Sequence, residues 1–394
     1  MQQEVEKMAG SIEKRGKNSY RLVYSMGFDA NGKRIKRTKT VHVKTKKEAE
    51  KELAKFIAEI EAGEYIKPAK MSLSDFIQLW RDNYAEKQLS PKTFETYNNY
   101  INTRIIPQLG HLQLADIKPI HLIRFLNNLK KDETRLDGKK GSLSEATINY
   151  YRRILKNIFN RAVEWKFLQV NPAEKLPKEK EDIGKGDVYD ENETRLLLKC
   201  LEKEDLKWRL YFTLALTCGL RKGELLALQW EDIDLESGTL YVKHSLSYTK
   251  EKGFFLKEPK SKKSKREIAI PSFVLPLLKK YKNVRLREKE KLQDEWEGGN
   301  YNFVFATWNG KPHHHSYPRT KWERFLKRNN LRYIRPHDLR HTSATIMLNN
   351  GVNYKTVSER LGHSSTRITF DFYVHRTKEA DRSAAECFDN QFGA

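Results

Sequence analysis

Hydrophobic and polar positions follow different patterns along the 394 residues, and the changes of pattern divide the chain into three segments. Near the N-terminus, residues 19–26 and 39–43 show the alternating or clustered apolar residues of strands, and Asp-Ala-Asn-Gly between them favours a turn. After Thr45, a suitable N-cap, apolar residues recur at helical spacing up to Gly63. Residues 1–66 are therefore predicted to form a small β-sheet with one helix.

The second segment, residues 70–176, has helical periodicity and no strong strand pattern. Ser90-Pro91 and Ser144 are residue types that begin helices. A charged, glycine-containing loop separates the third expected helix from the fourth. We predict an all-α domain whose helices cover residues 74–86, 90–106, 118–130 and 144–165.

A linker rich in charge, proline and glycine, residues 177–188, leads to a segment that mixes both patterns. Its strands are expected at residues 239–247 and 266–270. Its helices are expected at residues 206–218, 272–292, 317–329, 337–349 and 354–361. Residues 189–394 therefore read as a mixed α+β, mainly helical domain, and the whole chain as a multidomain protein.

The charge of the chain suggests a polyanionic partner. Lys and Arg number 75 against 52 Asp and Glu, which gives a net charge of +23 and a pI near 9.6. Residues 11–47 alone hold twelve cations and two acids, so we read the first sheet as a DNA-binding surface rather than a merely solvated face.

Other features of composition bear on location. The three cysteines form no CxxC pair, which argues against a disulfide framework or a zinc cluster. The N-terminus has no apolar signal core, and no stretch approaches the ~18 apolar residues of a membrane helix. We expect a protein of the cytoplasm with no membrane association.

Four short motifs of the third segment contain residue types suited to phosphodiester chemistry. They are TCGLRKGELL with Arg221, EPKSKKSKREIAI with Lys260, RPHDLRH with His337 and Arg340, and LGHSSTRITFDFY with His363 and Tyr373. Planar guanidinium forks bind phosphate oxygens in pairs and stay charged at any working pH. His337 precedes Arg340 by three residues, so both side chains can project from one helix face.

In order, type and spacing these motifs resemble the tyrosine recombinase family, the integrases of phages and transposons. The resemblance spans the C-terminal half, and the two upstream segments resemble that family's arm-type DNA-binding sheet and helical core-binding domain. It implies that Tyr373 attacks the phosphate and stays covalently attached while Arg221 and Arg340 stabilise the transition state. It further implies His337 as the base, His363 as a hydrogen-bond donor, and Lys260 as the acid that protonates the leaving 5′-oxygen.

Several assignments leave alternatives open. Lys262 and Lys263 could take the role given to Lys260, because hairpin length varies in the family. We read Glu224 as a residue that positions the arginine or lysine, and His341 as structural. The run from His313 to His315 reads as a solvent loop, since adjacent histidines do not readily converge on one metal ion.

The resemblance implies no metal and no nucleotide cofactor, because the tyrosyl ester stores the energy of the cleaved bond. The expected partners are double-stranded DNA at core and arm sites, three further copies of the chain in a tetramer on DNA, an excisionase and a host DNA-bending protein. Two other functions are compatible with parts of the pattern: a type IB topoisomerase-like enzyme, and a catalytically silent architectural DNA-binding protein.

Overall fold

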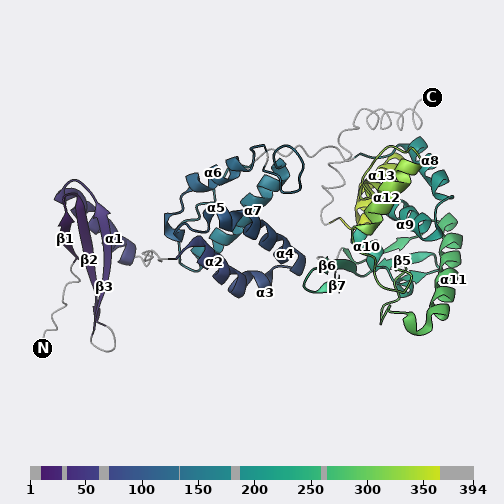
Figure 1. The fold of residues 1–394 in the computed structure, drawn as a ribbon, viewed down its shortest axis with the longest axis horizontal. Helices are drawn as coiled ribbons and strands as arrows, with labels where there is room; N and C mark the ends of the chain where they lie inside the picture. Colours follow the sequence, from purple (N-terminus) through teal and green to yellow (C-terminus); the bar gives the residue numbers. More distant parts are fainter. Residues whose placement is uncertain are drawn as a thin grey trace, which may run out of the picture. The chain divides into compact units, whose positions relative to one another are not determined.

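The computed structural model describes residues 10–28, 33–61, 71–132, 134–178, 187–258 and 264–363. The chain divides into two compact units, residues 1–181 and 182–394. Within the first unit, the N-terminal sheet and the helices that follow it have separate hydrophobic cores. The described chain therefore has three parts, each of which can be followed in Figure 1.

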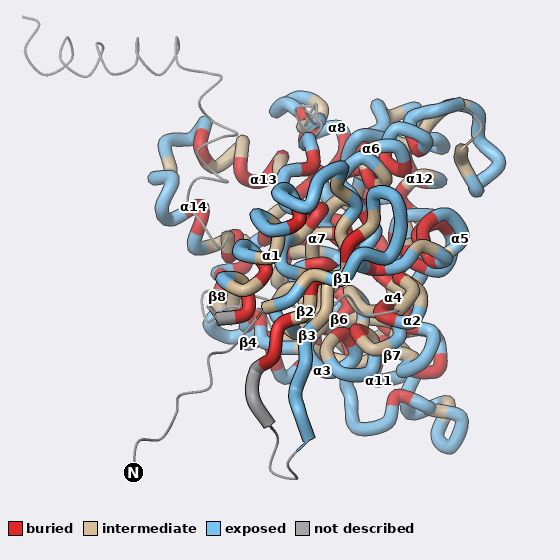
Figure 2. The backbone as a smooth tube through the Cα atoms, turned by 90° about the vertical axis from the view of Figure 1, so that its left-hand side faces the viewer, coloured by how far each residue is buried: buried red, intermediate tan, exposed pale blue. Residues whose placement is uncertain are grey.

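The N-terminal part is a three-stranded antiparallel sheet with one helix. Its elements are β1 (Gly10–Gly16), β2 (Ser19–Phe28), β3 (Arg34–His42) and α1 (Lys46–Glu61). The central strand β2 is the most buried of the three (Figure 2), because Leu22 and Tyr24 pack against Phe56 of α1. Side chains alternate along a strand, so Val23, between Leu22 and Tyr24, faces away from α1.

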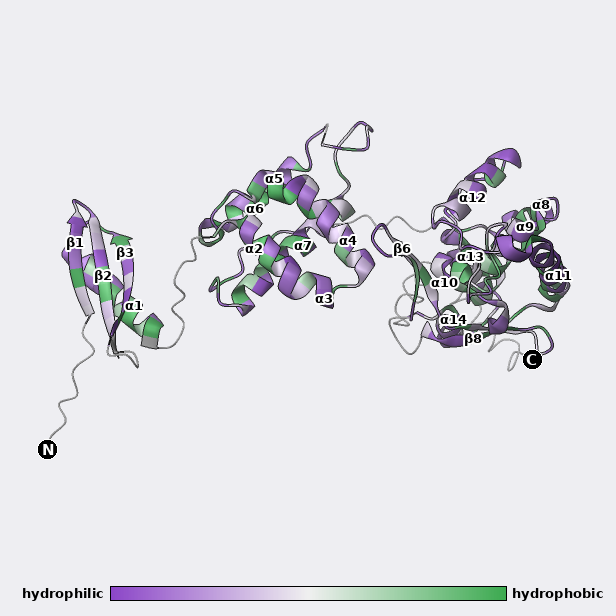
Figure 3. Cartoon of the chain, turned by 60° about the horizontal axis from the view of Figure 1, so that its bottom comes forward, coloured by the Kyte–Doolittle hydropathy of each residue, from purple (hydrophilic) through white to green (hydrophobic). Residues whose placement is uncertain are grey.

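The strand β1 is absent from the elements expected from sequence. Its seven residues, GSIEKRG, contain Ile12 as their one large apolar residue and therefore show no alternation. Ile12 pairs with Leu22 of β2, and pairing with a strongly apolar neighbour stabilises this polar strand. Both outer strands are largely hydrophilic (Figure 3).

The second part is helical, as expected. The side chains of Ser72, Ser90 and Ser144 each accept a hydrogen bond from a backbone N–H three residues later, and these bonds begin three of the helices. The buried face includes Trp80, whose indole N–H donates to Asn157 at 3.1 Å. The elements are α2 (Leu73–Trp80) continued by η1 (Arg81–Ala85) and α3 (Glu86–Gln88), α4 (Pro91–Tyr100) continued by η2 (Ile101–Ile105) and α5 (Ile106–Leu109), η3 (Leu114–Asp116), α6 (Pro119–Asn128) and α7 (Glu145–Glu164).

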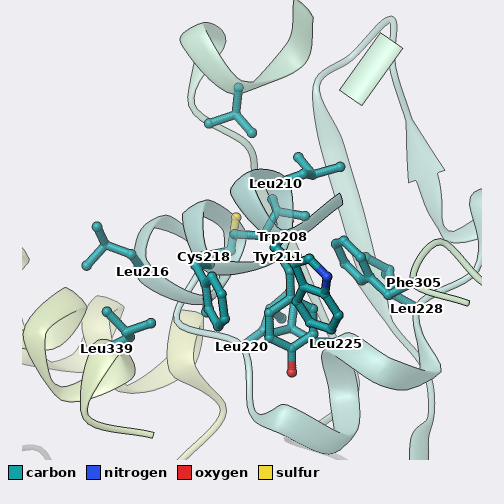
Figure 4. Packing of buried hydrophobic residues seen from close by; sticks show 14 of the residues in the cluster. Trp208, Leu210, Tyr211, Leu216, Cys218, Leu220, Leu225, Leu228, Phe305 and Leu339 are labelled. Atoms are coloured by element: carbon teal, nitrogen blue, oxygen red, sulfur yellow. The ribbon is translucent and has the colours of Figure 1, made fainter. Parts of the chain in front are cut away.

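The third part is built around α9 (Leu206–Thr217), which is apolar on nearly all sides. Figure 4 shows Trp208 and Tyr211 of this helix beside Phe305 and Leu225. The other helices are α8 (Glu191–Leu201), α10 (Lys222–Ala227), η4 (Trp230–Asp232), η6 (Ser272–Val274), α11 (Leu275–Leu292), η7 (Gln293–Glu295), α12 (Tyr317–Arg328), α13 (Asp338–Asn349) and α14 (Tyr354–Leu361).

Two small sheets complete the described residues of this part. The first has the order β4-β5-β8 and the second is the hairpin β6-β7. The single strand predicted over residues 239–247 is wrong, because the chain changes sheets after Val242. Lys243 at this break forms an ion pair of 2.8 Å with buried Asp232. The strands are β4 (Ile233–Asp234), β5 (Thr239–Val242), β6 (Ser245–Thr249), β7 (Gly253–Lys257) and β8 (Arg266–Ala269).

The predicted fold class is confirmed: a small sheet with a helix, an all-α domain, and a mixed, mainly helical domain. The boundaries predicted at residues 1–66, 70–176, 177–188 and 189–394 stay predictions. No helix in the described ranges combines the length and apolar character that crossing a membrane requires.

Candidate active site

Arg221 is placed by a tight turn between α9 and α10. Gly219 has a φ of +60°, which favours glycine, and Arg221 follows as the residue before α10. Its Nη1 donates to Oε1 of Glu224 at 2.8 Å, and its Nη2 donates to the carbonyl of Gly362 at 2.6 Å. The side chain of Arg221 remains 36% exposed, so its guanidinium is held in place and still reaches solvent. Glu224, which we expect to position the arginine or the lysine of the site, thus contacts Arg221, while Lys260 lies outside the described residues.

Glu224 is buried between two arginines. Its carboxylate accepts from the backbone N–H of Arg221 at 2.9 Å and from Nη2 of Arg266 at 2.9 Å. Burial alone would raise the pKa of Glu224, but hydrogen bonds and charge from Arg266, together with those from Arg221, lower this pKa below its ordinary value. Glu224 is therefore ionised and orients Arg221.

Arg340 projects from α13 and is only 2% exposed. Its Nη1 donates to the carbonyl of Gly219 at 2.7 Å. Its Nη2 is buried and, among the described residues, has no hydrogen-bond partner. Burial, and then the charge of Arg221, lower the pKa of Arg340 to about 9. The guanidinium is still protonated at neutral pH, so this buried donor carries positive charge and has no hydrogen-bonded anion in the part of the chain that the structure describes.

Three histidines lie around the two arginines. His337 is the residue before α13, and its ring centroid is 5.1 Å from that of His341. His363 follows Gly362, whose left-handed φ of 65° ends α14. Burial, and then the charge of Arg340, lower the pKa of His337 and bring that of His363 to about 3. Both imidazoles are therefore neutral at pH 7.

The structure thus brings together four of the six residues predicted for the site: Arg221, His337, Arg340 and His363. The remaining two, Lys260 and Tyr373, lie outside the described residues. Sequence reasoning missed Arg266, which directly contacts Glu224. The one available signal was its position at the start of the strand that follows the lysine-rich motif.

The prediction that His313 lies in a solvent loop is wrong. His313 is 7% exposed and stacks against Tyr317, with ring centroids 5.1 Å apart, while Trp208 packs nearby. A neutral imidazole can stack on these aromatic rings, and burial lowers the pKa of His313 to about 4. In the described part of the chain, no three His, Cys, Asp or Glu side chains are grouped so that they could hold a metal ion.

Two converging guanidinium groups, one with an unused buried donor, beside neutral imidazoles define a site for chemistry on a phosphate group. Three family models match the chain: the phage integrase family over residues 187–380, the N-terminal SAM-like domain of phage integrases over 72–130, and the arm DNA-binding domain over 9–60.

Proteins that are similar in sequence or in fold include recombinases and integrases. A "Tyrosine recombinase XerC-like" protein of Caldanaerobacter subterraneus subsp. tengcongensis is 32% identical, with 96% of this chain and 98% of that protein covered. The ICEBs1 integrase of Bacillus subtilis is 27% identical over 96% and 99%. The Tn1549 transposon integrase in complex with a circular intermediate DNA has a similar fold, with TM-score 0.65, 21% identity, and 81% and 99% covered. A lambda integrase tetramer bound to a Holliday junction gives a TM-score of 0.54 and 20% identity over 91% and 96%.

The chain belongs to the tyrosine recombinase family, also called the phage integrase family. It is an enzyme that cleaves and rejoins DNA in the site-specific recombination of mobile elements.

Proposed function

We propose that Tyr373 is the nucleophile of this recombinase and that Arg221 and Arg340 hold the scissile phosphate. The observation that carries the proposal is the buried Nη2 of Arg340, a charged donor without a partner among the described residues. A phosphate oxygen would satisfy this donor and supply the missing negative charge. The partly exposed guanidinium of Arg221 would bind a second oxygen of the same phosphate.

The proton transfers can be assigned from the protonation states of the histidines beside the two arginines. His337, neutral at pH 7, accepts the phenolic proton as the tyrosyl oxygen attacks phosphorus. His363, also neutral, donates a hydrogen bond to the phosphate. The bond from phosphorus to the 5′-oxygen breaks, and Lys260 gives that oxygen a proton. The product is a 3′-phosphotyrosine, which a 5′-hydroxyl of the partner strand attacks to reseal the DNA.

We assign the arm sites to the open face of the N-terminal sheet. Tyr20, Leu22 and Tyr24 point to α1, so their neighbours in β2 point away from it. In this open face Arg21 pairs with Thr40 and Val23 pairs with Thr38. A β-ribbon fits the major groove, and such cations and hydroxyls bind phosphates and base edges there.

We assign the core site to the helical domain. A recess at α4 and α7 concentrates positive charge and amide groups at one surface. It is lined by Tyr97, Asn149, Arg152, Arg153, Lys156, Asn157, Asn160 and Lys178. Nε of Arg152 is buried there without a partner among the described residues, so a DNA phosphate would satisfy it.

We propose that four protomers assemble on DNA, because two duplexes are each cut on both strands and each site supplies one tyrosine. Residues 380–394, outside the described residues, contain a short amphipathic pattern that would dock on a neighbouring protomer. An excisionase and a host DNA-bending protein would set the direction of recombination, and the reaction would take place in the bacterial cytoplasm.

Removing residues 380–394 should lower tetramer yield on paired sites in native gels while binding to one core site stays normal.

The test of the nucleophile is covalent trapping. Protein is mixed with a nicked duplex whose cleaved end diffuses away, and the products are separated on a denaturing gel. Wild-type protein should give a DNA adduct. Tyr373→Phe should bind the same duplex with unchanged affinity and give none. A persisting adduct in the variant would remove Tyr373 from this role, and no adduct with the wild type would refute covalent cleavage altogether.

A further inference from the structure

Arg266, the first residue of β8, touches three separate segments of the candidate active site. Its Nη2 and Nη1 donate to the two oxygens of Glu224, at 2.9 and 3.3 Å. Its Nε donates to the carbonyl of Arg360 in α14 at 2.6 Å. Its Nη1 also lies 3.2 Å from the carbonyl of Ser264. One buried guanidinium therefore contacts α10, the end of α14, and the segment that follows Lys260.

These contacts close a ring around the site. Arg221 bonds to Glu224, Glu224 to Arg266, Arg266 to the last turn of α14, and Gly362 at the end of α14 back to Arg221. The ring also explains why position 362 is a glycine. A Cβ atom on Gly362 would lie 2.8 Å from Nη1 of Arg266, in a position where φ is already +65°. The space beside Gly362 is thus reserved for Arg266.

The ring also distributes charge. Glu224 and Arg266 are each 6% exposed, so their ion pair is shielded from water. Glu224 carries one negative charge and faces two guanidinium groups. Because Arg266 balances that charge, the positive charge of Arg221 remains available to a phosphate. Without Arg266, Glu224 would neutralise Arg221, and an anionic ligand would meet a weaker field.

We infer that Arg266 is a positioning residue of the recombination reaction. It fixes Glu224 and the end of α14, and it keeps the positive charge of Arg221 available to the phosphate. The inference rests on the proposed roles of Arg221 and His363, since Arg266 acts through them. Holding Glu224 and the end of α14 while balancing the charge of Glu224 requires a planar group with several N–H donors, which a guanidinium provides. Lysine, which presents a single point charge, would replace the charge and lose the bidentate contact with Glu224.

The test compares full-length Arg266→Gln with Arg285→Gln as a matched control. Arg285 is also a buried, paired arginine: Nη1 lies 2.5 Å from Glu288 and Nη2 donates to the carbonyl of Thr307. Single-turnover cleavage of the nicked duplex and affinity for the same duplex are measured for each variant. Residues that orient the ligands of catalytic metal ions typically contribute about 10- to 100-fold to activity, and we take the same range for a residue that orients Arg221. Arg266→Gln should slow cleavage by about that factor, with affinity changed less than about threefold; Arg285→Gln should lower thermal stability and leave cleavage unchanged.

A second-site variant separates positioning from simple destabilisation. In Arg266→Gln the carboxylate of Glu224 neutralises Arg221. Adding Glu224→Gln removes that neutralising charge and should cost no further rate, although Glu224→Gln alone slows the wild type. If the two losses multiply instead, or if Arg266→Gln cleaves at the wild-type rate, the inference is wrong. A wild-type protein that forms no adduct would point to failure of the proposed function rather than of Arg266.

Discussion

Replacing Arg340 with methionine should abolish cleavage and, at the same time, stabilise the catalytic domain. The pKa of Arg340 falls from its ordinary value above 12 to about 9, chiefly because the group is buried. A difference of three powers of ten in proton affinity corresponds to about 4 kcal/mol of unfavourable free energy for the charged form. Losing the hydrogen bond to Gly219 offsets ~1.5–3 kcal/mol of this. We expect Arg340→Met to raise the free energy of unfolding by about 1–3 kcal/mol, as when buried charges are replaced by apolar residues.

Urea unfolding followed by tryptophan fluorescence measures this change, because five of the seven tryptophans lie after residue 187. Arg285→Met is the control. Arg285 is buried but paired with Glu288, so its loss should destabilise the domain. A transition-state donor that is removed typically costs about a hundredfold to a thousandfold in rate, so Arg340→Met should also lose cleavage to at least this extent. If Arg340→Met is destabilised as much as Arg285→Met, the idea that Arg340 is an unsatisfied charge held for phosphate is refuted.

Three further predictions concern the other parts of the account. Arg221→Ala should cleave at least about a hundredfold more slowly in single-turnover assays, and near-normal cleavage would exclude it from the site. Deleting residues 1–66 should spare cleavage of short core sites and abolish integration that depends on distant arm sites; equal integration by both proteins would contradict the arm-binding assignment. Burial lowers the pKa of His341 to about 4 and that of His363 to about 3, so the unfolded chain binds more protons below pH ~6.5. Stability should therefore fall between pH 7 and pH 5, and it should fall less in His341→Gln, as urea unfolding at the two pH values can show.

Much of the fold could be predicted because its elements have strong local signals. The helix α7 begins at the cap Ser144 and has a clear apolar face, and α9 is apolar over most of its length. The missing strand and the split strand had no such signal. Gly10–Gly16 is held by its neighbour β2, and at the break after Val242 Lys243 pairs with buried Asp232, a contact that no strand pattern encodes.

The residues of the candidate site divide in the same way, into those with a local sequence signal and those without one. Arg221, His337, Arg340 and His363 stand in short motifs whose order and spacing carry information. The role of Arg266 depends on contacts with residues 42 and 94 positions away, which no local pattern encodes. The burial of His313 depends likewise on aromatic partners from α9 and α12. Long-range packing therefore limits what sequence alone provides.

The most direct test of the account is to identify the residue that carries the DNA. The adduct formed on a nicked duplex is digested with trypsin and nuclease, and the nucleotide-bearing peptide is sequenced by mass spectrometry. Cleavage after Arg367 and Arg376 releases ITFDFYVHR, in which Tyr373 is the only tyrosine. The account predicts a nucleotide on Tyr373 in this peptide. A nucleotide attached to any other residue would contradict it.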